Sequence, residues 1–199
     1  LGIGGMQLFT AESPGPSADK LKPRIADTAK RLWFIYVGFT AIQTLLLKLA
    51  GMGLFDAVNH AMTTMATGGF STKNESAAFW NENPLIQYIL ILFMFIAGAN
   101  FVLSYFGFKG RFGKIWRDDE FRWYSGFVVT FTIIATLVIY FQADLGLSSI
   151  EHPMVLGEGE SAFRHALFQV ISIITTTGLI SADYTLMTPF LTVLFFGLF

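Results

Sequence analysis

The stretch MATGGFST, from Met65 to Thr72, lies between a short apolar segment and a long one. A related stretch, TTTGL from Thr175 to Leu179, has the same setting, with its glycine 109 residues after Gly69. Glycine has no β-carbon and accepts positive φ angles, so a loop that contains it can turn its carbonyl groups toward one side. The two stretches therefore predict a pair of matched loops whose backbone oxygens can act as ligands.

Each loop follows an apolar segment of 13 residues, at 54–66 and at 163–175. Thirteen helical residues extend over about 20 Å, which is less than the roughly 30 Å hydrocarbon core of a bilayer. The length therefore predicts short helices that are buried in protein or re-enter the membrane without crossing it. The two copies match at an offset of 109 residues, in the pairs Ala57 and Ala166, Thr63 and Ser172, Thr67 and Thr176, Gly69 and Gly178, and Phe70 and Leu179.

The composition of the chain favours a membrane protein. Hydrophobic residues make up 53% of its 199 residues and charged residues only 14%, whereas soluble domains carry roughly 25% charged residues. These proportions exclude a disordered chain, a basic protein that binds nucleic acid and most small soluble enzymes. The sequence contains no cysteine, which excludes thiol catalysis, disulfide bonds and zinc sites built on cysteine.

Long apolar stretches alternate with the short ones. A helix needs about 20 apolar residues to cross a bilayer. Three stretches meet this requirement, namely 32–50, 84–108 and 123–143. A fourth, 185–199, is uncharged and stops with the chain, so we interpret it as a partial span and both chain ends as arbitrary. Asn83 followed by Pro84 predicts a capping side chain at the start of the second span.

The distribution of charge predicts an orientation. Ten of the 13 basic residues lie in the segments 1–31 and 109–122. These ten are Lys20, Lys22, Arg24, Lys30, Arg31, Lys109, Arg111, Lys114, Arg117 and Arg122. Cytoplasmic loops carry such an excess of Lys and Arg, so both segments are predicted to face the cytoplasm. The segments 51–83 and 144–184, which carry acidic residues, are predicted to face the outside.

These features together predict an all-α membrane protein built from a repeated unit of outer helix, re-entrant pore helix, filter loop and inner helix. Residues 1–31 are a cytoplasmic segment and residues 109–122 a cytoplasmic linker. The first unit, 32–108, has its outer helix at 32–50, pore helix at 54–66, filter loop at 67–70 and inner helix at 84–108. The second unit, 123–199, has its outer helix at 123–143, pore helix at 163–175, filter loop at 176–179 and a truncated inner helix at 185–199.

The filter loops suggest coordination of a dehydrated cation. Non-helical backbone at membrane depth persists only where protein covers it or where it lines water. Several such loops around one axis would replace the water shell of a cation with carbonyl oxygens, and the C-terminal ends of the short helices would add partial negative charge. Alternatively, the glycines only end helices, and the protein is a non-conducting membrane scaffold or assembly subunit.

Five stretches, spread over almost the whole chain, carry a family resemblance. They are GIGGMQLFTAESPGP (Gly2–Pro16), PRIADTAKRLW (Pro23–Trp33), MATGGFST (Met65–Thr72), FMFIAGANFVLSYFGFKGR (Phe93–Arg111) and TTTGLISADY (Thr175–Tyr184). In combination they resemble the TrkH/KtrB superfamily of potassium transporters, and its TrkH branch most closely. The resemblance implies potassium uptake across the inner membrane of a bacterium, with potassium as substrate and no bound cofactor.

The resemblance also implies four units in one polypeptide around one pore, of which this chain holds the second and most of the third. The residues that match the family's filter are Thr67, Gly68, Gly69, Thr176, Thr177 and Gly178, which would bind potassium through their carbonyl oxygens. Leu179 stands where many filters carry Phe or Tyr, which leaves the pore interpretation intact. The expected partners are membrane lipid, the remaining units of the same transporter, a second copy in a homodimer and a cytosolic nucleotide-binding regulatory subunit.

Other polar groupings predict no catalytic or metal centre, and we expect the protein not to be an enzyme. Asp56 and His60 are spaced to share one helical face, but no third ligand lies near them in the sequence. His165 is predicted to lie on the outer surface. The acidic run at 118–120 is predicted to form solvated ion pairs with its basic neighbours.

Overall fold

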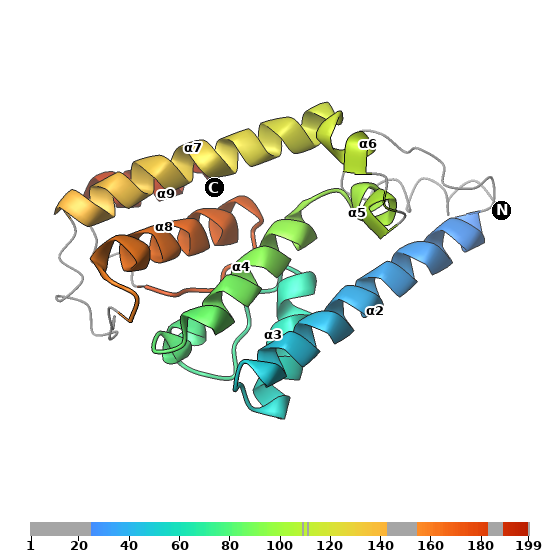
Figure 1. Ribbon diagram of the computed structural model, residues 1–199, viewed down its shortest axis with the longest axis horizontal. Coiled ribbons are helices and arrows are strands. Elements are labelled where there is room, and N and C mark those ends of the chain that lie inside the picture. Colours follow the sequence, from blue (N-terminus) through green and yellow to red (C-terminus); the bar gives the residue numbers. More distant parts are fainter. Residues whose placement is uncertain (1–24, 109, 111, 143–154, 183–188, 199) are drawn as a thin grey trace.

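The computed structural model describes residues 25–108, 110, 112–142, 155–182 and 189–198, and every regular element in these ranges is a helix (Figure 1). The helices are α2 (Ile25–Leu49), α3 (Leu54–Met65), η1 (Ser76–Trp80), α4 (Pro84–Gly98), α5 (Phe101–Phe108), α6 (Phe112–Trp116), α7 (Asp119–Gln142), α8 (Glu158–Ile174) and α9 (Pro189–Leu198). The stretch Gly2–Pro16 and parts of the predicted segments 1–31, 109–122, 144–184 and 185–199 lie outside the described residues.

Two helices of the described residues are long and apolar enough to cross a membrane, at Ala29–Leu49 and Asp119–Phe141. They lie where the sequence predicts the two outer helices, although α2 and α7 both begin earlier, in segments predicted as cytoplasmic. The extension of α7 has a local cause. The carboxylate of Asp118 accepts a hydrogen bond from the N–H of Phe121 at 3.0 Å and so caps the first turn.

The predicted single inner helix at 84–108 is wrong, because the structure contains two helices there. α4 ends at Gly98, Ala99 adopts an extended conformation with φ −82° and ψ 156°, and α5 begins at Phe101. The run carries no charged residue through this break, so the absence of charge that predicts one long span does not reveal it, although Gly98 and Asn100 flank Ala99. The 15 residues of α4 extend about 22 Å.

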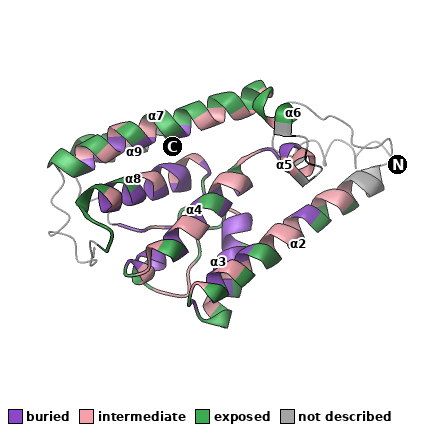
Figure 2. Cartoon of the chain, in the orientation of Figure 1, coloured by how far each residue is buried: buried purple, intermediate pink, exposed green. Residues whose placement is uncertain are grey.

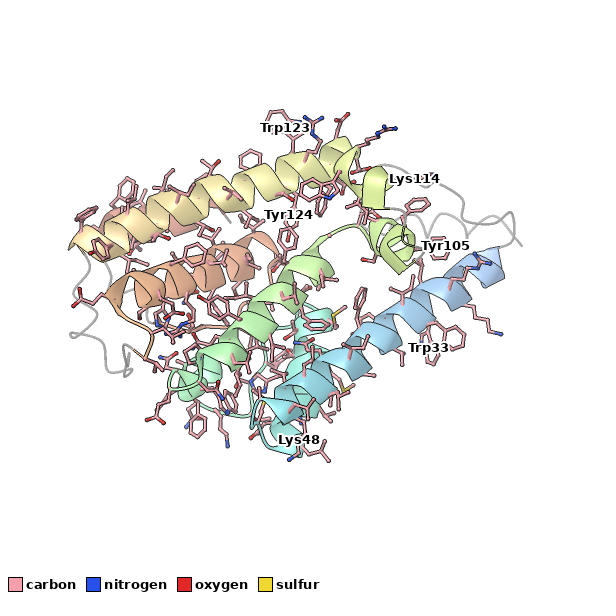
Figure 3. The ribbon with its side chains drawn as sticks, in the orientation of Figure 1. Trp33, Lys48, Tyr105, Lys114, Trp123 and Tyr124 are labelled. Carbon is pink, nitrogen blue, oxygen red and sulfur yellow. The ribbon has the colours of Figure 1, made fainter. Side chains whose placement is uncertain are left out.

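The break exposes a backbone carbonyl that another helix then satisfies. The N–H of Ala99 bonds to the carbonyl of Ile96 at 3.2 Å instead of reaching back to Phe95. The hydroxyl of Tyr124 on α7 donates to the carbonyl of Phe95 at 3.1 Å, and Figure 3 shows Tyr124 pointing from α7 toward α4. Interruptions of the helical ladder persist where a neighbouring group satisfies the freed carbonyl.

The predicted capping role of Asn83 is also wrong. Its side chain makes no hydrogen bond to the first turn of α4. Instead, Nδ2 donates to the carbonyl of Ala50 at 2.7 Å, just after the end of α2. Pro84 occupies the start of the helix and has no N–H to satisfy, so the Asn83 side chain is available to join α4 to α2.

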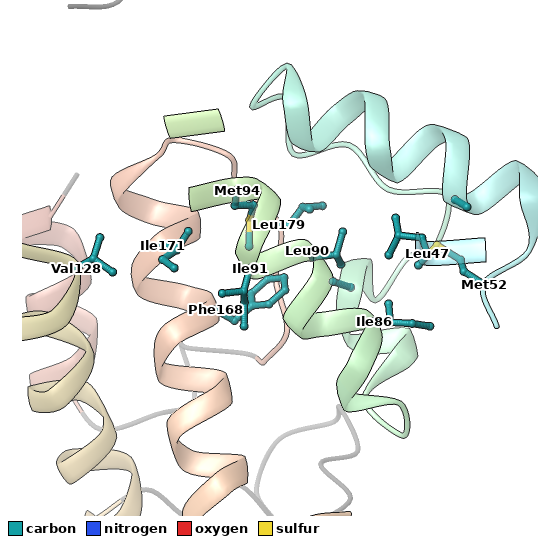
Figure 4. Packing of buried hydrophobic residues seen from close by; sticks show 12 residues of the cluster. Leu47, Met52, Ile86, Leu90, Ile91, Met94, Val128, Phe168, Ile171 and Leu179 are labelled. Carbon is teal, nitrogen blue, oxygen red and sulfur yellow. The ribbon is translucent and has the colours of Figure 1, made fainter. Parts of the chain in front are cut away.

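α8 lies between α4 and α7 at the centre of the molecule (Figure 1). Apolar side chains of α4 and α8 face one another there (Figure 4). The shared cluster includes Leu47, Met52, Ile86, Leu90, Ile91, Met94, Val128, Phe168, Ile171 and Leu179. Because α4 belongs to the first predicted unit and α8 to the second, this core fixes how the two units, and hence their loops, lie against each other.

The outward faces of α2 and α7 are exposed along much of their length (Figure 2). Their exposed apolar side chains include Phe34, Val37, Leu45, Phe127, Val129, Ile133, Leu137 and Phe141. Trp33 and Trp123 point outward where α2 and α7 lie near α5 and α6 (Figure 3). Continuous apolar surface with aromatic residues near its end is typical of helices that contact lipid.

Candidate functional site

The two predicted filter loops, called the first loop (67–70) and the second loop (176–179), have the same backbone geometry. Thr67 and Thr176 adopt φ angles of 49° and 54°. Gly69 and Gly178 adopt φ angles of 70° and 78°. Positive φ is easy for glycine but strained for a β-branched threonine. Since each pair is separated by 109 residues, the repeat in the sequence is also a repeat in the fold.

The chain enters both loops through the same backbone hydrogen bonds. At the end of α3, the donors Ala66, Thr67 and Gly68 bond to the carbonyls of Met62, Thr64 and Thr63, respectively. At the end of α8, the donors Thr175, Thr176 and Thr177 bond to the carbonyls of Ile171, Ile173 and Ser172, respectively. Each short helix therefore ends in an identical turn, which directs the following residues into the loop.

A hydroxyl group on each short helix supports the far side of its loop. Oγ1 of Thr63 on α3 accepts a hydrogen bond from the N–H of Phe70 at 2.9 Å. Oγ of Ser172 on α8 donates to the carbonyl of Leu179 at 2.7 Å. The two hydroxyls occupy matched positions and bond to matched residues, so their shared role is to hold the end of the loop against its helix.

The first and second loops touch each other at Gly69. A β-carbon added to Gly69 would lie 2.5 Å from the carbonyl oxygen of Thr177 and 3.3 Å from the α-carbon of Gly178. Gly69 thus lacks room for a side chain and also has the φ angle that disfavours one. At Gly178 the matched approach is looser, because an added β-carbon would lie 3.7 Å from the α-carbon of Gly69.

A second pair of matched contacts holds the segments that follow the loops. Oγ1 of Thr72 donates to the carboxylate of Asp56 at 2.6 Å. At the same offset, Nδ1 of His165 lies 3.1 Å from Oγ of Ser181. His165 is fully buried, so its predicted place on the outer surface is wrong. The reason is that α8 begins at Glu158 and not at the predicted residue 163, which puts His165 in the helix interior.

His60 is a buried packing residue whose two ring nitrogens both lie near hydrogen-bonding partners. Its Nδ1 lies 2.9 Å from the carbonyl of Asp56 and its Nε2 lies 3.0 Å from Oγ of Ser71. A carbonyl only accepts hydrogen bonds, so Nδ1 carries the proton and Nε2 accepts from Ser71. Burial lowers the pKa of His60 below 6.5, which favours this neutral form. The described residues hold no group of three potential metal ligands.

The two loops differ in what covers them. Leu179 at the end of the second loop is 1% exposed, whereas Phe70 at the matched position of the first loop is 81% exposed. Residues of the first unit cover the second loop: Ala78 donates its N–H to the carbonyl of Ile180 at 3.0 Å, and Ser76 Oγ accepts from the Ile180 N–H at 3.2 Å. Among the described residues, none covers the corresponding face of the first loop at Phe70.

Together the six predicted site residues form two adjoining loops of polar backbone. Thr67, Gly68, Gly69, Thr176, Thr177 and Gly178 all lie in the described part of the chain. Oγ1 of Thr177 in the second loop lies 2.7 Å from Oγ1 of Thr175, the residue just before that loop. The loops contain no charged side chain, so the ligands they offer to an ion are carbonyl and hydroxyl oxygens, which suit a weakly hydrated monovalent cation.

Besides His165, sequence reasoning missed the burial of Arg164 near this site. Arg164 on α8 is fully buried and bonds to Glu160 and to Gln87 of α4. The sequence contains a signal for it, because Arg164 interrupts an otherwise apolar short helix. The sequence places Arg164 in the second predicted pore helix, within the outward-facing segment 144–184, but does not show that a partner on another helix buries it.

The chain is similar to known cation transport proteins. A family model described as TrkH, a cation transport protein, matches residues 1–198. The potassium uptake protein TrkH of Escherichia coli K12 is 43% identical over 180 residues, which are 89% of this chain and 35% of the relative. TrkH of Vibrio parahaemolyticus is 40% identical over 198 residues, covering 96% of this chain and 38% of the relative. The chain thus spans about a third of the length of these relatives.

A solved structure gives the same result. The crystal structure of the potassium transporter TrkH from Vibrio parahaemolyticus matches with a TM-score of 0.77 and 32% identity, over 89% of this chain and 36% of that one. The predicted all-α membrane fold is therefore confirmed. The resemblance found in the sequence is confirmed as well: the chain belongs to the TrkH family of cation transport proteins.

Proposed function

We propose that this chain supplies two of the four filter loops of a potassium uptake protein. The observation that carries the proposal is the contact of two loops with the same backbone geometry, at Gly69 and Thr177. Carbonyl groups on adjoining strained loops can replace the water shell of a cation without any charged ligand. The names of the relatives favour potassium as that cation.

The open face of the first loop supports a further unit before this chain's first unit. Leu179 is buried in a cluster that includes residues of the preceding unit, whereas Phe70, its matched residue, has no such cover among the described residues. In the proposed transporter, additional units would cover Phe70 and complete the ring of loops.

We propose that the protein lies in the inner membrane of a bacterium, with lipid around α2 and α7. We also propose that it forms a homodimer and binds a cytosolic nucleotide-binding regulatory subunit.

The test is cation flux through the full-length protein in liposomes. Potassium and rubidium uptake are measured with sodium as competitor, first for the wild type and then for Gly69→Asp and Gly178→Asp. At both positions the positive φ disfavours a side chain and the carboxylate adds negative charge to the loop, and at Gly69 the side chain also collides with the backbone of the other loop. The expected result is lost uptake or a marked fall in the preference for potassium over sodium.

Gly126→Ala is the matched control, since a β-carbon at Gly126 on α7 meets nothing within 4 Å. It is expected to behave as the wild type. If the wild type carries no cation, or if both Gly→Asp variants keep wild-type uptake and selectivity, the proposal is wrong. The alternative of a non-conducting scaffold would then account for the loops as packing elements.

A further inference from the structure

Arg164 is the largest fully buried side chain of the described residues. Its Nε donates to Oε1 of Glu160 at 2.8 Å, one turn earlier on α8. Its Nη1 donates to Oε1 of Gln87 on α4. The guanidinium group thus connects the pore helix of the second unit to the inner helix of the first.

The same two helices are joined by further polar contacts around this pair. The hydroxyl of Tyr88 on α4 donates to Oε1 of Glu160 at 2.9 Å. Nε2 of Gln87 donates to Oδ1 of Asn81, which lies between η1 and α4. The side chain of Glu160 is only 18% exposed. Arg164 is therefore the centre of a network whose members come from both units.

The first unit has no such charged pair at matched positions. At the offset of 109 residues, Glu160 and Arg164 correspond to Gly51 and Phe55. The side chain of Phe55 is 73% exposed. α3 also has 12 residues where α8 has 17, and the additional first turns of α8 carry Glu160. A pore helix can thus form without the pair, so the pair serves the contact between units and not the fold of one unit.

Joining two helices through buried charged groups costs free energy. A buried ion pair loses the hydration of both groups, and apolar residues of similar size often stabilise a core as well or better. In this chain, Nη2 of Arg164 and Oε2 of Glu160 are buried without a hydrogen-bond partner among the described residues. The pair instead fixes the relative position of α4 and α8, because hydrogen bonds from a planar guanidinium have a defined geometry at their acceptors.

The network lies where the relative position of α4 and α8 affects both loops. α8 leads directly into the second loop, and Asn81 and α4 follow the first loop along the chain. The loops touch at Gly69, and the units also meet where Ala78 bonds to Ile180. A small shift of α8 along α4 would therefore change how the two loops face each other.

We propose that Arg164 is a positioning residue for ion selection, which holds α8 against α4 so that the two loops keep their relative position. This inference rests on the proposed function. Arg164 and Glu160 make no contact with the ion in this proposal. Their loss is expected to lower the preference for potassium over sodium, with a smaller effect on the yield of folded protein.

The experiment uses the full-length protein, reconstituted after selection of the monodisperse fraction. Potassium uptake and its competition by sodium are measured for the wild type, Arg164→Met, Arg164→Lys and Gln87→Met. Arg164→Met is expected to lower the preference for potassium over sodium by at least about fivefold, the lower end of the usual coupling between distant sites. Arg164→Lys keeps the charge and one of the two contacts, and should recover part of this loss.

Gln87→Met leaves the Arg164–Glu160 pair in place and removes the bond from Arg164 to α4, together with the bond from Gln87 to Asn81. It therefore serves if Arg164→Met fails to fold. It is expected to lower the preference for potassium while leaving the yield of folded protein unchanged. Arg122→Met is the matched control, because Arg122 forms an exposed ion pair with Asp119 at 3.6 Å. Wild-type selectivity in Gln87→Met, or equal selectivity in Arg164→Lys and Arg164→Met, would overturn the inference. Absence of potassium transport in the wild type would instead refute the proposed function.

Discussion

Gly98, at the end of α4, packs against Thr175, the last residue before the second loop. A β-carbon at Gly98 would lie 2.3 Å from Cγ2 of Thr175 and 2.9 Å from the hydroxyl oxygen of Tyr124. The break in the inner helix of the first unit therefore lies directly against the start of the loop of the second unit. A side chain added at Gly98 would therefore displace Thr175, at the start of the second loop.

Gly98→Ala is expected to destabilise the protein by about 1–3 kcal/mol, which is typical of overpacking. The cost arises from the collision with Thr175 and outweighs the better helix propensity of alanine. Thermal unfolding of the full-length protein in detergent measures it. Adding Thr175→Ser removes Cγ2 but keeps the hydroxyl that bonds to Ile171 and Thr177, so the double variant should recover part of the loss. Equal stability of Gly98→Ala and the wild type would contradict the proposed close approach.

Tyr124→Phe is expected to destabilise the break by about 0.5–1.5 kcal/mol, because the carbonyl of Phe95 loses its hydrogen bond. The same unfolding measurement is made on Tyr140→Phe, a half-exposed tyrosine on the same helix, as control. If both variants lose the same free energy of unfolding, the hydrogen bond from Tyr124 to Phe95 does not stabilise the break.

Gly69→Ala is expected to be more harmful than Gly178→Ala. Both substitutions place alanine at a positive φ, which costs about 1–2 kcal/mol. Only Gly69→Ala also sets a β-carbon 2.5 Å from a backbone oxygen of the other loop. Potassium uptake at matched protein amounts gives the order, and the reverse order would show that the contact at Gly69 does not constrain the loops.

Ser172→Ala is expected to cost about 1 kcal/mol, because a buried hydroxyl that donates to the carbonyl of Leu179 is lost. Thr63→Val removes the matched bond to Phe70 while keeping the shape of the side chain. Both variants should reduce the preference for potassium over sodium, since each frees one loop from its helix. Unchanged selectivity in both would mean that these hydroxyls stabilise the helices alone.

His60 is expected to make stability dependent on pH. Burial lowers the pKa of His60 in the folded protein, so the unfolded chain binds the proton more tightly. The contribution of neutral His60 is therefore complete above about pH 6.5 and decreases as the pH falls below that value. Melting temperatures between pH 8 and pH 5 should fall less for His60→Gln than for the wild type, and parallel curves would contradict the prediction.

The sequence was sufficient to predict the matched loops and the helices that lead into them. Gly69 and Gly178 recur at a fixed offset because the same positive φ is needed twice, and local composition shows this requirement directly. The contact between Gly69 and Thr177 could not be predicted, since it depends on how α4 packs against α8.

The errors have a common physical origin. The break at Ala99 lies within a run that carries no charge, and mean hydropathy does not report a change in backbone angle. Arg164 and His165 are polar residues at the start of the second predicted pore helix, and composition alone does not reveal that both are buried. In each case a partner on another helix, Tyr124 for the break or Gln87 for Arg164, decides the outcome.

The most direct test of the central claim is to locate the bound ion. Crystals of the full-length protein grown with rubidium in place of potassium would reveal the ion by its anomalous scattering. The account predicts a peak lined by the carbonyl groups of 67–69 and 176–178, which weakens when sodium replaces rubidium. A protein that transports potassium and shows no rubidium peak between these two loops would contradict it.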